Sequence, residues 1–312
     1  MKSKKLISIV VPVYNEELGI PELISQLTKF ANKTTNYDFE FILVENGSID
    51  NSFKLLQRFS KKDSRIKVIQ LARNVGCDGG IEAGMQYAKG DGLVIMMADL
   101  QEPIGLILDF INQWEKGYDI VYGVVKKRTS SFTRNVFSIL FYKIINLLTG
   151  DMFPENASDF RLIDKKVYQI INSLQERNKY LRGLIAWTGF KQIGVPFDRN
   201  KRFAGESKAN FLTVLKVAAN GIFSFSYIPL RFISILGFII TIFSFLMIGF
   251  YLYLFIIWGR VAPGTTTIIL LLLFLFGILF FVLGIISEYL VRIYEEAKSR
   301  PTYIIKNKIN LN

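Results

Sequence analysis

Near the C-terminal end of the chain, two long stretches without any charged residue stand apart from the pattern that precedes them. They extend from Phe232 to Gly259 and from Val261 to Ser287. A transmembrane helix needs about 20 apolar residues to cross a hydrocarbon core of about 30 Å, and both stretches are longer than that. The pattern therefore predicts two transmembrane helices, at about 232–258 and 266–287, within a membrane segment at 229–290.

In the preceding 228 residues, short apolar runs of strand length alternate with segments that have apolar residues at helical spacing. Strands that alternate with helices are typical of a mostly parallel sheet covered by helices on both faces. The sequence therefore predicts an α/β domain at 1–228. Its expected strands are 7–13, 39–44, 66–71, 93–98, 119–123 and 191–198, and its expected helices are 17–30, a segment from 51 onward, 79–88, 103–114, 164–174 and 179–187.

Two further segments of this domain, at 131–148 and 211–227, combine apolar and aromatic residues with basic side chains at helical spacing. Amphipathic helices of this kind lie in the plane of a membrane surface, so we expect both segments to be interfacial helices. Ordinary packing of the two helices onto the sheet is the alternative.

The basic residues around the two apolar stretches indicate an orientation in the membrane. Arg260 lies between the stretches, Arg231 precedes the first, and five basic residues follow the second: Arg292, Lys298, Arg300, Lys306 and Lys308. Because basic residues are retained on the cytoplasmic side, we expect both termini, the 1–228 domain and a basic tail at 291–312 to be cytosolic. The apolar run at 6–13 is too short for a signal peptide.

The absence of histidine narrows the chemistry open to the chain. Without histidine, Ser–His–Asp and Cys–His catalysis are excluded, and acid–base catalysis must fall to carboxylates. The single cysteine, Cys77, excludes an intrachain disulfide and a cysteine cluster for zinc. The net charge of +12 suits nucleic acid, anionic lipid or phosphate, and the apolar stretches favour lipid headgroups and phosphates over nucleic acid.

Polar residues cluster directly after four of the predicted strands. Ligands bind at the carboxyl ends of the strands in an open parallel sheet, so we expect these clusters to meet at one edge. Each cluster alone also fits a helix cap or a turn, and the chain has neither a Gly-x-Gly-x-x-Gly fingerprint nor a Walker sequence. Acid-rich strand ends suit a divalent metal that bridges a diphosphate. The clusters are Tyr14-Asn15-Glu16-Glu17, Glu45-Asn46-Gly47-Ser48 with Asp50, Arg73-Asn74 with Gly76, and Asp99 with Gln101 and Glu102.

Six motifs stand in the order of a known family. The chain resembles the polyprenyl-phosphate glycosyltransferase branch of glycosyltransferase family 2, which includes dolichyl-phosphate mannose synthases and bactoprenol glucosyltransferases. The resemblance covers nearly the whole chain and implies a GT-A-like fold. The motifs are Val11-Pro12-Val13-Tyr14-Asn15-Glu16-Glu17, Glu45-Asn46-Gly47-Ser48-Ile49-Asp50, Arg73-Asn74-Val75-Gly76, Asp99-Leu100-Gln101-Glu102-Pro103, Ser158-Asp159-Phe160-Arg161-Leu162 and Arg202-Phe203-Ala204-Gly205-Glu206-Ser207-Lys208.

The resemblance also implies roles for individual residues. Asp159 matches the proposed catalytic base, and Asp99 and Gln101 match the positions that hold Mg²⁺ or Mn²⁺ on the donor diphosphate. The residues implied in donor binding are Pro12, Tyr14, Glu16, Glu45, Asn46, Gly47, Arg73 and Asp99. Those implied in binding the phosphates or the acceptor are Arg128, Arg134, Arg161, Arg202 and Lys208.

The implied reaction is the metal-dependent, inverting transfer of a sugar from a nucleotide-sugar to undecaprenyl phosphate at the cytosolic face of a bacterial cytoplasmic membrane. It belongs to the synthesis of cell-envelope glycans. UDP-glucose is the expected donor, and UDP-N-acetylglucosamine, UDP-galactose and GDP-mannose stay open. The relatives imply a homo-oligomer, such as a tetramer, and no nucleic-acid partner is expected.

Two departures from the family pattern leave alternatives open. Met97 stands at the first acidic position of the usual Asp-x-Asp-Leu-Gln, and Glu45-Asn46 stands where Asp-Asp is usual. A missing carboxylate at 97 weakens or alters metal binding, so the chain could be a weakly active or inactive paralogue that binds nucleotide or lipid as a scaffold. Because Asp99, Gln101 and Asp159 are retained, an active enzyme is favoured. A processive polysaccharide synthase would carry a Gln-x-x-Arg-Trp motif and more spans, which the sequence lacks.

Overall fold

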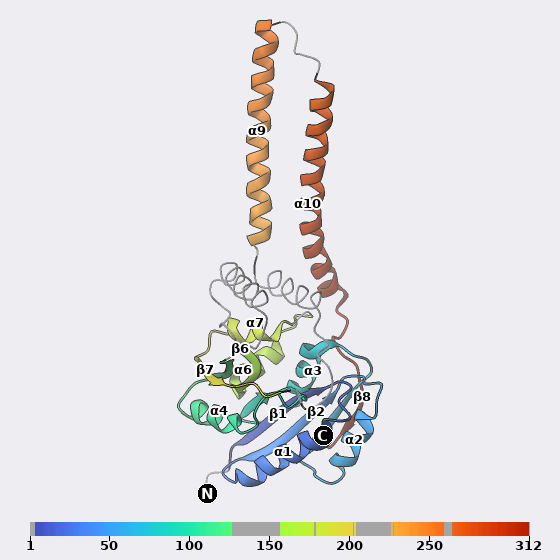
Figure 1. Cartoon of the computed structure of the whole chain (residues 1–312), viewed down its shortest axis with the longest axis vertical. Helices are drawn as coiled ribbons and strands as arrows, with labels where there is room; N and C mark the ends of the chain where they lie inside the picture. The colour runs from blue at the N-terminus through green and yellow to red at the C-terminus, as the bar shows by residue number, and fades with distance from the viewer. Residues whose placement is uncertain are drawn as a thin grey trace. The chain divides into compact units, whose positions relative to one another are not determined.

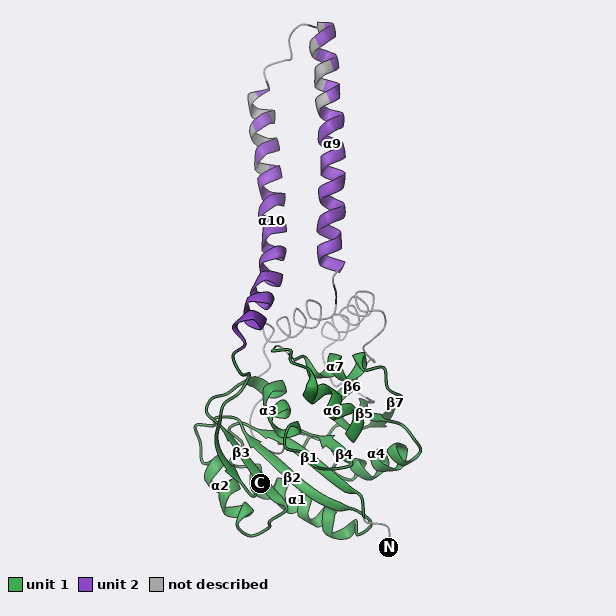
Figure 2. Cartoon of the chain, turned by 180° about the vertical axis from the view of Figure 1, so that it is seen from behind, with its two compact units in different colours: residues 1–221, 300–312 green, residues 222–299 purple. Residues whose placement is uncertain are grey.

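The computed structural model describes residues 4–126, 157–177, 179–201, 203, 226, 228–258 and 264–311. The chain forms two compact units (Figure 2), one of residues 1–221 and 300–312 and the other of residues 222–299. The predicted amphipathic helices at 131–148 and 211–227 lie outside the described residues, apart from Ser226.

The first unit is built on an eight-stranded sheet with the order β7-β5-β6-β4-β1-β2-β3-β8. Figure 1 labels β1, β2, β6, β7 and β8 of this sheet. Its centre is parallel and consists of β4 (Gly92–Ile95), β1 (Leu6–Val13), β2 (Asp38–Glu45) and β3 (Ile66–Leu71). On one side, β6 (Ala157–Asp164) is antiparallel to both β4 and β5 (Ile120–Val125), and β7 (Gln192–Phe197) is parallel to β5. On the other side, β8 (Ile305–Ile309) is antiparallel to β3. The prediction of a mostly parallel sheet is confirmed.

Helices cover both faces of this sheet, as the sequence predicts. One apolar core contains side chains of α1 (Ile20–Lys33), α2 (Ser52–Ser60) and α4 (Leu106–Glu115). The core on the opposite face contains side chains of α3 (Gly76–Met85), α6 (Lys165–Ser173) and α7 (Leu181–Trp187). Strands buried on both faces are mostly apolar, which explains the composition of β1 and β2. The buried Ser8 of β1 and Glu40 of β2 are hydrogen-bonded to each other.

Two of the strands, β6 and β8, are not among those predicted from the sequence. β6 contains the Ser158-Asp159-Phe160-Arg161-Leu162 motif and lies between β4 and β5. β8 lies within the predicted tail at 291–312, after the end of α10, and adds a strand to the edge of β3. Residues 300–312 therefore belong to the same compact unit as the sheet.

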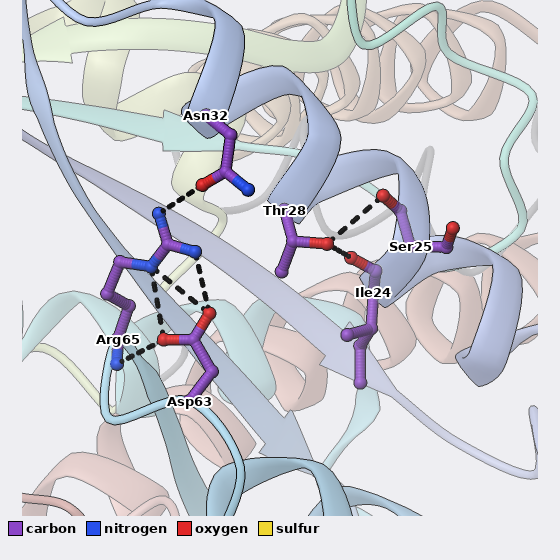
Figure 3. A network of polar contacts seen from close by, with 6 residues as sticks. All are labelled: Ile24, Ser25, Thr28, Asn32, Asp63 and Arg65. Carbon is purple, nitrogen blue, oxygen red and sulfur yellow. Dashed lines mark hydrogen bonds and ion pairs between the residues drawn. The ribbon is translucent and has the colours of Figure 1, made fainter.

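A polar network fixes the edge of the sheet at which β3 begins (Figure 3). The Arg65 guanidinium donates to both carboxylate oxygens of Asp63, with a shortest distance of 2.7 Å from Nη2 to Oδ2. Its Nη1 donates to Asn32 Oδ1 on α1 at 3.1 Å. This network joins the end of α1 to the start of β3, at the edge opposite the carboxyl ends of the parallel strands.

The second unit contains the two apolar helices that the sequence predicts, α9 (Ile228–Trp258) and α10 (Thr265–Lys298). Both are long and apolar enough to cross a membrane, over Ile228–Met247 and Phe274–Lys298. Large apolar side chains along them are exposed, including Phe245 at 71% and Phe280 at 69%. Their exposure in water would be costly, so these surfaces suit a lipid environment.

Candidate active site

The loops that follow β1 and β2 are hydrogen-bonded to each other at the carboxyl edge of the sheet. The Asn15 backbone amide donates to Ser48 Oγ at 3.0 Å, and the Ile49 amide donates back to Asn15 Oδ1 at 3.0 Å. The Glu16 amide donates to Ser52 Oγ at 3.0 Å. These bonds bring the half-buried Tyr14 and Glu16 beside the end of β2, where donor-binding residues are predicted.

Asn46 joins this pair of loops to the loop after β3. Its Nδ2 donates to the Gly76 carbonyl at 2.7 Å, and its Oδ1 accepts from the Val75 amide at 3.0 Å. Gly47 has a φ of 67°, and a Cβ there would lie 2.7 Å from the Arg73 carbonyl carbon. A side chain is thus excluded by both conformation and space. A Cβ on Gly80 of α3 would lie 3.2 Å from Pro12 Cβ, so the predicted residues Pro12, Asn46, Gly47 and Arg73 meet here.

Glu45 is fully buried at the end of β2, and its carboxylate is only partly satisfied. Oε1 accepts a hydrogen bond from the Ser48 amide. Within the described part of the chain, Oε2 has no hydrogen-bond partner. A buried carboxylate oxygen without a donor is energetically costly, so this atom suits a hydrogen-bond donor brought by a ligand.

The loop after β4 carries the predicted metal-binding residues. Asp99 is 9% exposed, and its Oδ1 accepts from the Gln101 amide at 3.2 Å across a turn in which Leu100 has a φ of 57°. Gln101 Nε2 donates to the Asn200 carbonyl at 3.4 Å, so the segment after β7 lies against this loop.

Asp99 and Gln101 supply one carboxylate and one carboxamide oxygen, both hard ligands of the kind that Mg²⁺ and Mn²⁺ take. No group of three or more His, Cys, Asp or Glu residues that could together hold a metal ion occurs among the residues described. The pair therefore fits an ion that takes its other ligands from water and a substrate diphosphate, as Mg²⁺ commonly does.

Asp159 lies on β6, on the sheet face covered by α3, α6 and α7. Phe160 and Leu162 contribute to the opposite core, so the alternation along the strand turns Asp159 and Arg161 toward α7. Arg182 of α7 donates to Asp159 Oδ1 from Nε at 3.0 Å and from Nη2 at 2.7 Å. Arg161 Nη2 lies 3.8 Å from the same oxygen. Partial burial raises the pKa of the Asp159 carboxyl, but Arg182 and Arg161 outweigh it and hold this pKa below its usual value.

Glu102 links the loop after β4 to β6. Its Oε2 accepts from the Met97 amide at 2.9 Å, and its Oε1 accepts from Ser158 Oγ at 3.0 Å. Burial raises the pKa of the Glu102 carboxyl to about 7, and Asp159 and Asp99 add to this rise. Glu102 belongs to one of the predicted strand-end clusters, but no role is predicted for it. Its contact with Ser158 joins residues 56 positions apart and cannot be recognised from local sequence.

Met97, at the family's first acidic position, is half-buried, and its Sδ lies 3.7 Å from Cys77 Sγ of α3. Thioether and thiol sulfurs are poor ligands for Mg²⁺. The oxygen atoms of Asp99 and Gln101 are therefore better suited to bind this ion than Met97 or Cys77. On the next residue of α3, burial and the nearby Asp159 raise the pKa of Asp78 to about 7. Asp78 and Arg182 are further charged residues of the site and are not among the residues predicted from the sequence.

The structure thus places the predicted residues in two adjoining groups. One group surrounds the ends of β1, β2 and β3, and the other surrounds the ends of β4 and β6. The Cys77–Met97 contact and the position of Gly19, whose Cβ would lie 3.7 Å from both Glu16 Oε2 and the Ala98 carbonyl, connect the two groups. Four predicted phosphate-binding or acceptor-binding residues lie outside the described residues: Arg128, Arg134, Arg202 and Lys208.

Comparison with known proteins shows similarity to glycosyltransferases along nearly the whole chain. The model of the family described as "Glycosyl transferase family 2" matches residues 8–171, just over half of the chain. The "Uncharacterized glycosyltransferase YkcC" of Bacillus subtilis (strain 168) is 39% identical over 97% of this chain and 94% of its own length. The "Bactoprenol glucosyl transferase" of Shigella phage SfV is 33% identical over 97% of this chain and 98% of its own length.

Among solved structures, mannosyl-3-phosphoglycerate synthase from Rubrobacter xylanophilus has a similar fold, with a TM-score of 0.50. The alignment covers 69% of this chain and 71% of that chain at 11% sequence identity. At this identity the likeness concerns the fold alone.

Proposed function

Since the chain belongs to glycosyltransferase family 2 and is a glycosyltransferase, we propose that it transfers a hexose from a nucleotide-sugar to a polyprenyl phosphate at the cytosolic face of a membrane. The observation that carries this proposal is the end-to-end similarity to a bactoprenol glucosyl transferase, which includes the two apolar helices. A lipid acceptor would explain these helices, because an enzyme that acts on a membrane lipid has to bind its substrate at the membrane surface.

The proposed donor site lies around Glu45 and Asn46. The unpartnered Glu45 Oε2 suits an N–H or O–H of the nucleotide base or ribose. Pro12, Tyr14 and Gly47, at the ends of the paired strands β1 and β2, are further proposed donor-binding residues. UDP-glucose is the proposed donor, and UDP-N-acetylglucosamine, UDP-galactose and GDP-mannose are alternatives. Asp99 and Gln101 are the proposed ligands of Mg²⁺ or Mn²⁺, which when bound would neutralise charge on the leaving nucleoside diphosphate.

In the proposed reaction, an oxygen of the acceptor phosphate forms a bond to the anomeric carbon. The bond from that carbon to the diphosphate oxygen breaks, and the nucleoside diphosphate leaves with the electron pair. A single displacement of this kind inverts the configuration and needs no covalent glycosyl–enzyme. A phosphate monoester has a second pKa of about 6, so Asp159 would take the last proton only from the fraction that is still protonated. Its lowered pKa keeps it ionised for this task.

The test is a transfer assay with the full-length protein in detergent. We would supply undecaprenyl phosphate, Mg²⁺ or Mn²⁺ and a panel of nucleotide-sugars, and detect the glycolipid by mass spectrometry. We expect a product with one donor, its loss on chelation with EDTA, and a loss of about 1,000-fold or more in Asp159→Asn, within the range for removing a catalytic acid–base group. Asp109→Asn on the exposed side of α4 is the matched control and should retain activity.

Met97 supports one alternative, a paralogue that binds nucleotide or lipid without turnover. In place of a second carboxylate, the site has a thioether in contact with Cys77. Nucleotide binding without a product from any donor would favour this alternative and contradict the transferase proposal. The proposed homo-oligomer stays a prediction, to be measured by light scattering of the purified protein.

A further inference from the structure

Two arginines lie near Asp159, and Arg182 makes the closer contact. Arg161 is 6% exposed in its side chain, and its Nη2 donates to the Ser158 carbonyl at 2.9 Å. Arg182 instead directs Nε and Nη2 to a single carboxylate oxygen, Oδ1, at 3.0 and 2.7 Å. In the described part of the chain, no hydrogen bond ends on Asp159 Oδ2. One oxygen of the carboxylate is therefore held by α7, and the other is available to a ligand.

The backbone that carries Arg182 is itself well anchored. Leu181, Leu184 and Ile185 of α7 are each 2% exposed, and Leu181 and Ile185 pack in the core that also contains Ile163 of β6. The helix therefore presents Arg182 to β6 from a fixed position. An arginine that donates two hydrogen bonds from a rigid planar group limits the rotation of its carboxylate partner.

Resting on the proposed function, we infer that Arg182 is a positioning residue for sugar transfer, which orients the Asp159 carboxylate through Oδ1 and leaves Oδ2 to face the acceptor phosphate. The Asp159 side chain is 39% exposed, so a substrate can reach it, while that of Arg182 is 25% exposed. A general base has to stand within hydrogen-bond reach of the proton that it takes, and a misplacement of about 1 Å can cost about 100-fold in rate.

Among the described residues, the charged groups near Asp159 come from β6, α3, α7 and the segments after β4 and β7. Arg182 of α7, Arg161 of β6 and Arg199 after β7 favour the ionised carboxylate. Glu102 after β4 and Asp78 of α3 are the acidic groups that face it. If Arg182 is removed, the pKa of Asp159 has to rise, because burial opposes the charge and only part of the opposing field remains.

A second role for Arg182 is conceivable from its partial exposure, since a guanidinium also binds a phosphate directly. The two roles differ in kinetics. A positioning residue affects the turnover of bound substrate, so kcat falls while KM for the lipid phosphate changes little. A phosphate ligand contributes to acceptor binding, so its loss raises that KM.

The experiment compares Arg182→Gln and Arg182→Lys with wild type in the same transfer assay. We expect Arg182→Gln to lower kcat by about 100-fold, with the KM for undecaprenyl phosphate within about threefold of wild type. The acid limb of the kcat profile should move to higher pH, and lysine should restore part of this shift because it keeps the charge but not the bidentate contact. Arg58→Gln, an exposed arginine on α2, is the matched control.

A double variant tests whether Arg182 acts through Asp159. In the Asp159→Asn background, Arg182→Gln should cause little further loss, because the group that it positions has already been changed. Additive losses, or a raised KM with unchanged kcat, would overturn the inference. If Arg182→Gln does not fold, as judged by thermal unfolding, Arg182→Lys decides by the same criteria. If the wild-type protein forms no product with any donor, the proposed function is contradicted. If Arg182→Gln has normal kcat, only the inference about Arg182 is contradicted.

Discussion

Glu102 is a buried residue, 2% exposed, and both oxygens of its carboxyl group accept hydrogen bonds. Its raised pKa has a consequence for stability. Because the folded protein holds the Glu102 proton more tightly than the unfolded chain, this group favours folding most below pH 4.5. Its contribution is lost as the pH rises from there to about 7.

We therefore predict that Glu102→Gln flattens the dependence of stability on pH. Glutamine does not titrate; its carbonyl oxygen can accept from the Met97 amide, and its amide group can donate to Ser158 Oγ in place of the bond that Glu102 accepts. At about 1.4 kcal/mol per pKa unit, the variant should gain on the order of 2–3 kcal/mol relative to wild type between pH 5 and pH 8. Thermal unfolding in detergent with EDTA measures this difference. An equal response in both proteins would show that the carboxyl is ionised in the folded state, and Asp109→Asn is the exposed control.

The conformation of Gly47 allows a direct test of the donor site. In Gly47→Ala, the left-handed backbone costs about 1–2 kcal/mol, and the new Cβ also has to displace the Arg73–Asn74 backbone. We expect nucleotide-sugar to bind about tenfold more weakly, which corresponds to about 1.4 kcal/mol.

The matched control is Gly117→Ala, which has a φ of 89° but no atom within 4 Å of its Cβ. Both variants carry the backbone penalty, so the difference between them isolates the crowding at Arg73. Isothermal titration with the donor that gives product is the measurement. Unchanged affinity in Gly47→Ala would place the nucleotide elsewhere.

The short elements of the fold differ in how far the sequence reveals them. β1, β2 and β3 were predictable because strands buried on both faces are mostly apolar and rich in β-branched residues. β6 was missed because two charged residues, Asp159 and Arg161, interrupt its apolar pattern, and only the α7 arginine and the Ser158 carbonyl explain how they are accommodated. The carboxyl-edge clusters were read from the sequence, whereas the roles of Glu102 and Arg182 depend on contacts between distant segments.

β8 gave no local signal because Lys306, Asn307 and Lys308 dominate its five residues. Its partner strand is far away in sequence: the contact from Asn307 to Gln70 joins residues 237 positions apart. Lysines on such a strand also discourage further pairing at the free edge of the sheet. The strand is thus a property of the tertiary structure more than of its own sequence.

We predict that Asn310 secures β8 to the sheet. Its Nδ2 donates to the carbonyls of Ser60 and Ile66 at 2.8 and 2.9 Å, so Asn310→Ala should lower the free energy of unfolding by about 1–3 kcal/mol. Asn310→Gly separates the lost bonds from backbone strain, because Asn310 has a φ of 57°. Asn307→Ala, which loses an exposed contact, should change stability by less than about 0.5 kcal/mol. Equal effects at 307 and 310 would contradict the prediction.

For the whole molecule, the decisive question is the orientation in the membrane. The positive-inside pattern predicts that the segment between α9 and α10 is outside the cell and that the catalytic unit is inside. The chain has one native cysteine, Cys77, in the catalytic unit, and it serves as an internal reference.

We expect a membrane-impermeant thiol reagent on intact cells to label Gly264→Cys, at the start of α10, in a Cys77→Ser background. The wild-type protein should be labelled at Cys77 only after the membrane is opened. Gel shift with a thiol-reactive polymer is the measurement. Labelling of Cys77 in intact cells would reverse the proposed topology.

The return of the chain to the sheet after α10 also sets an order of events during synthesis. Domains normally begin to fold from their N-terminal side while translation continues. Here the strand that completes the edge of the sheet is translated only after both apolar helices have been translated. The β3 edge thus lacks its β8 partner until both helices have been synthesised. A chain that ends before β8 would therefore carry an exposed edge at β3, and such an edge is open to pairing with other chains.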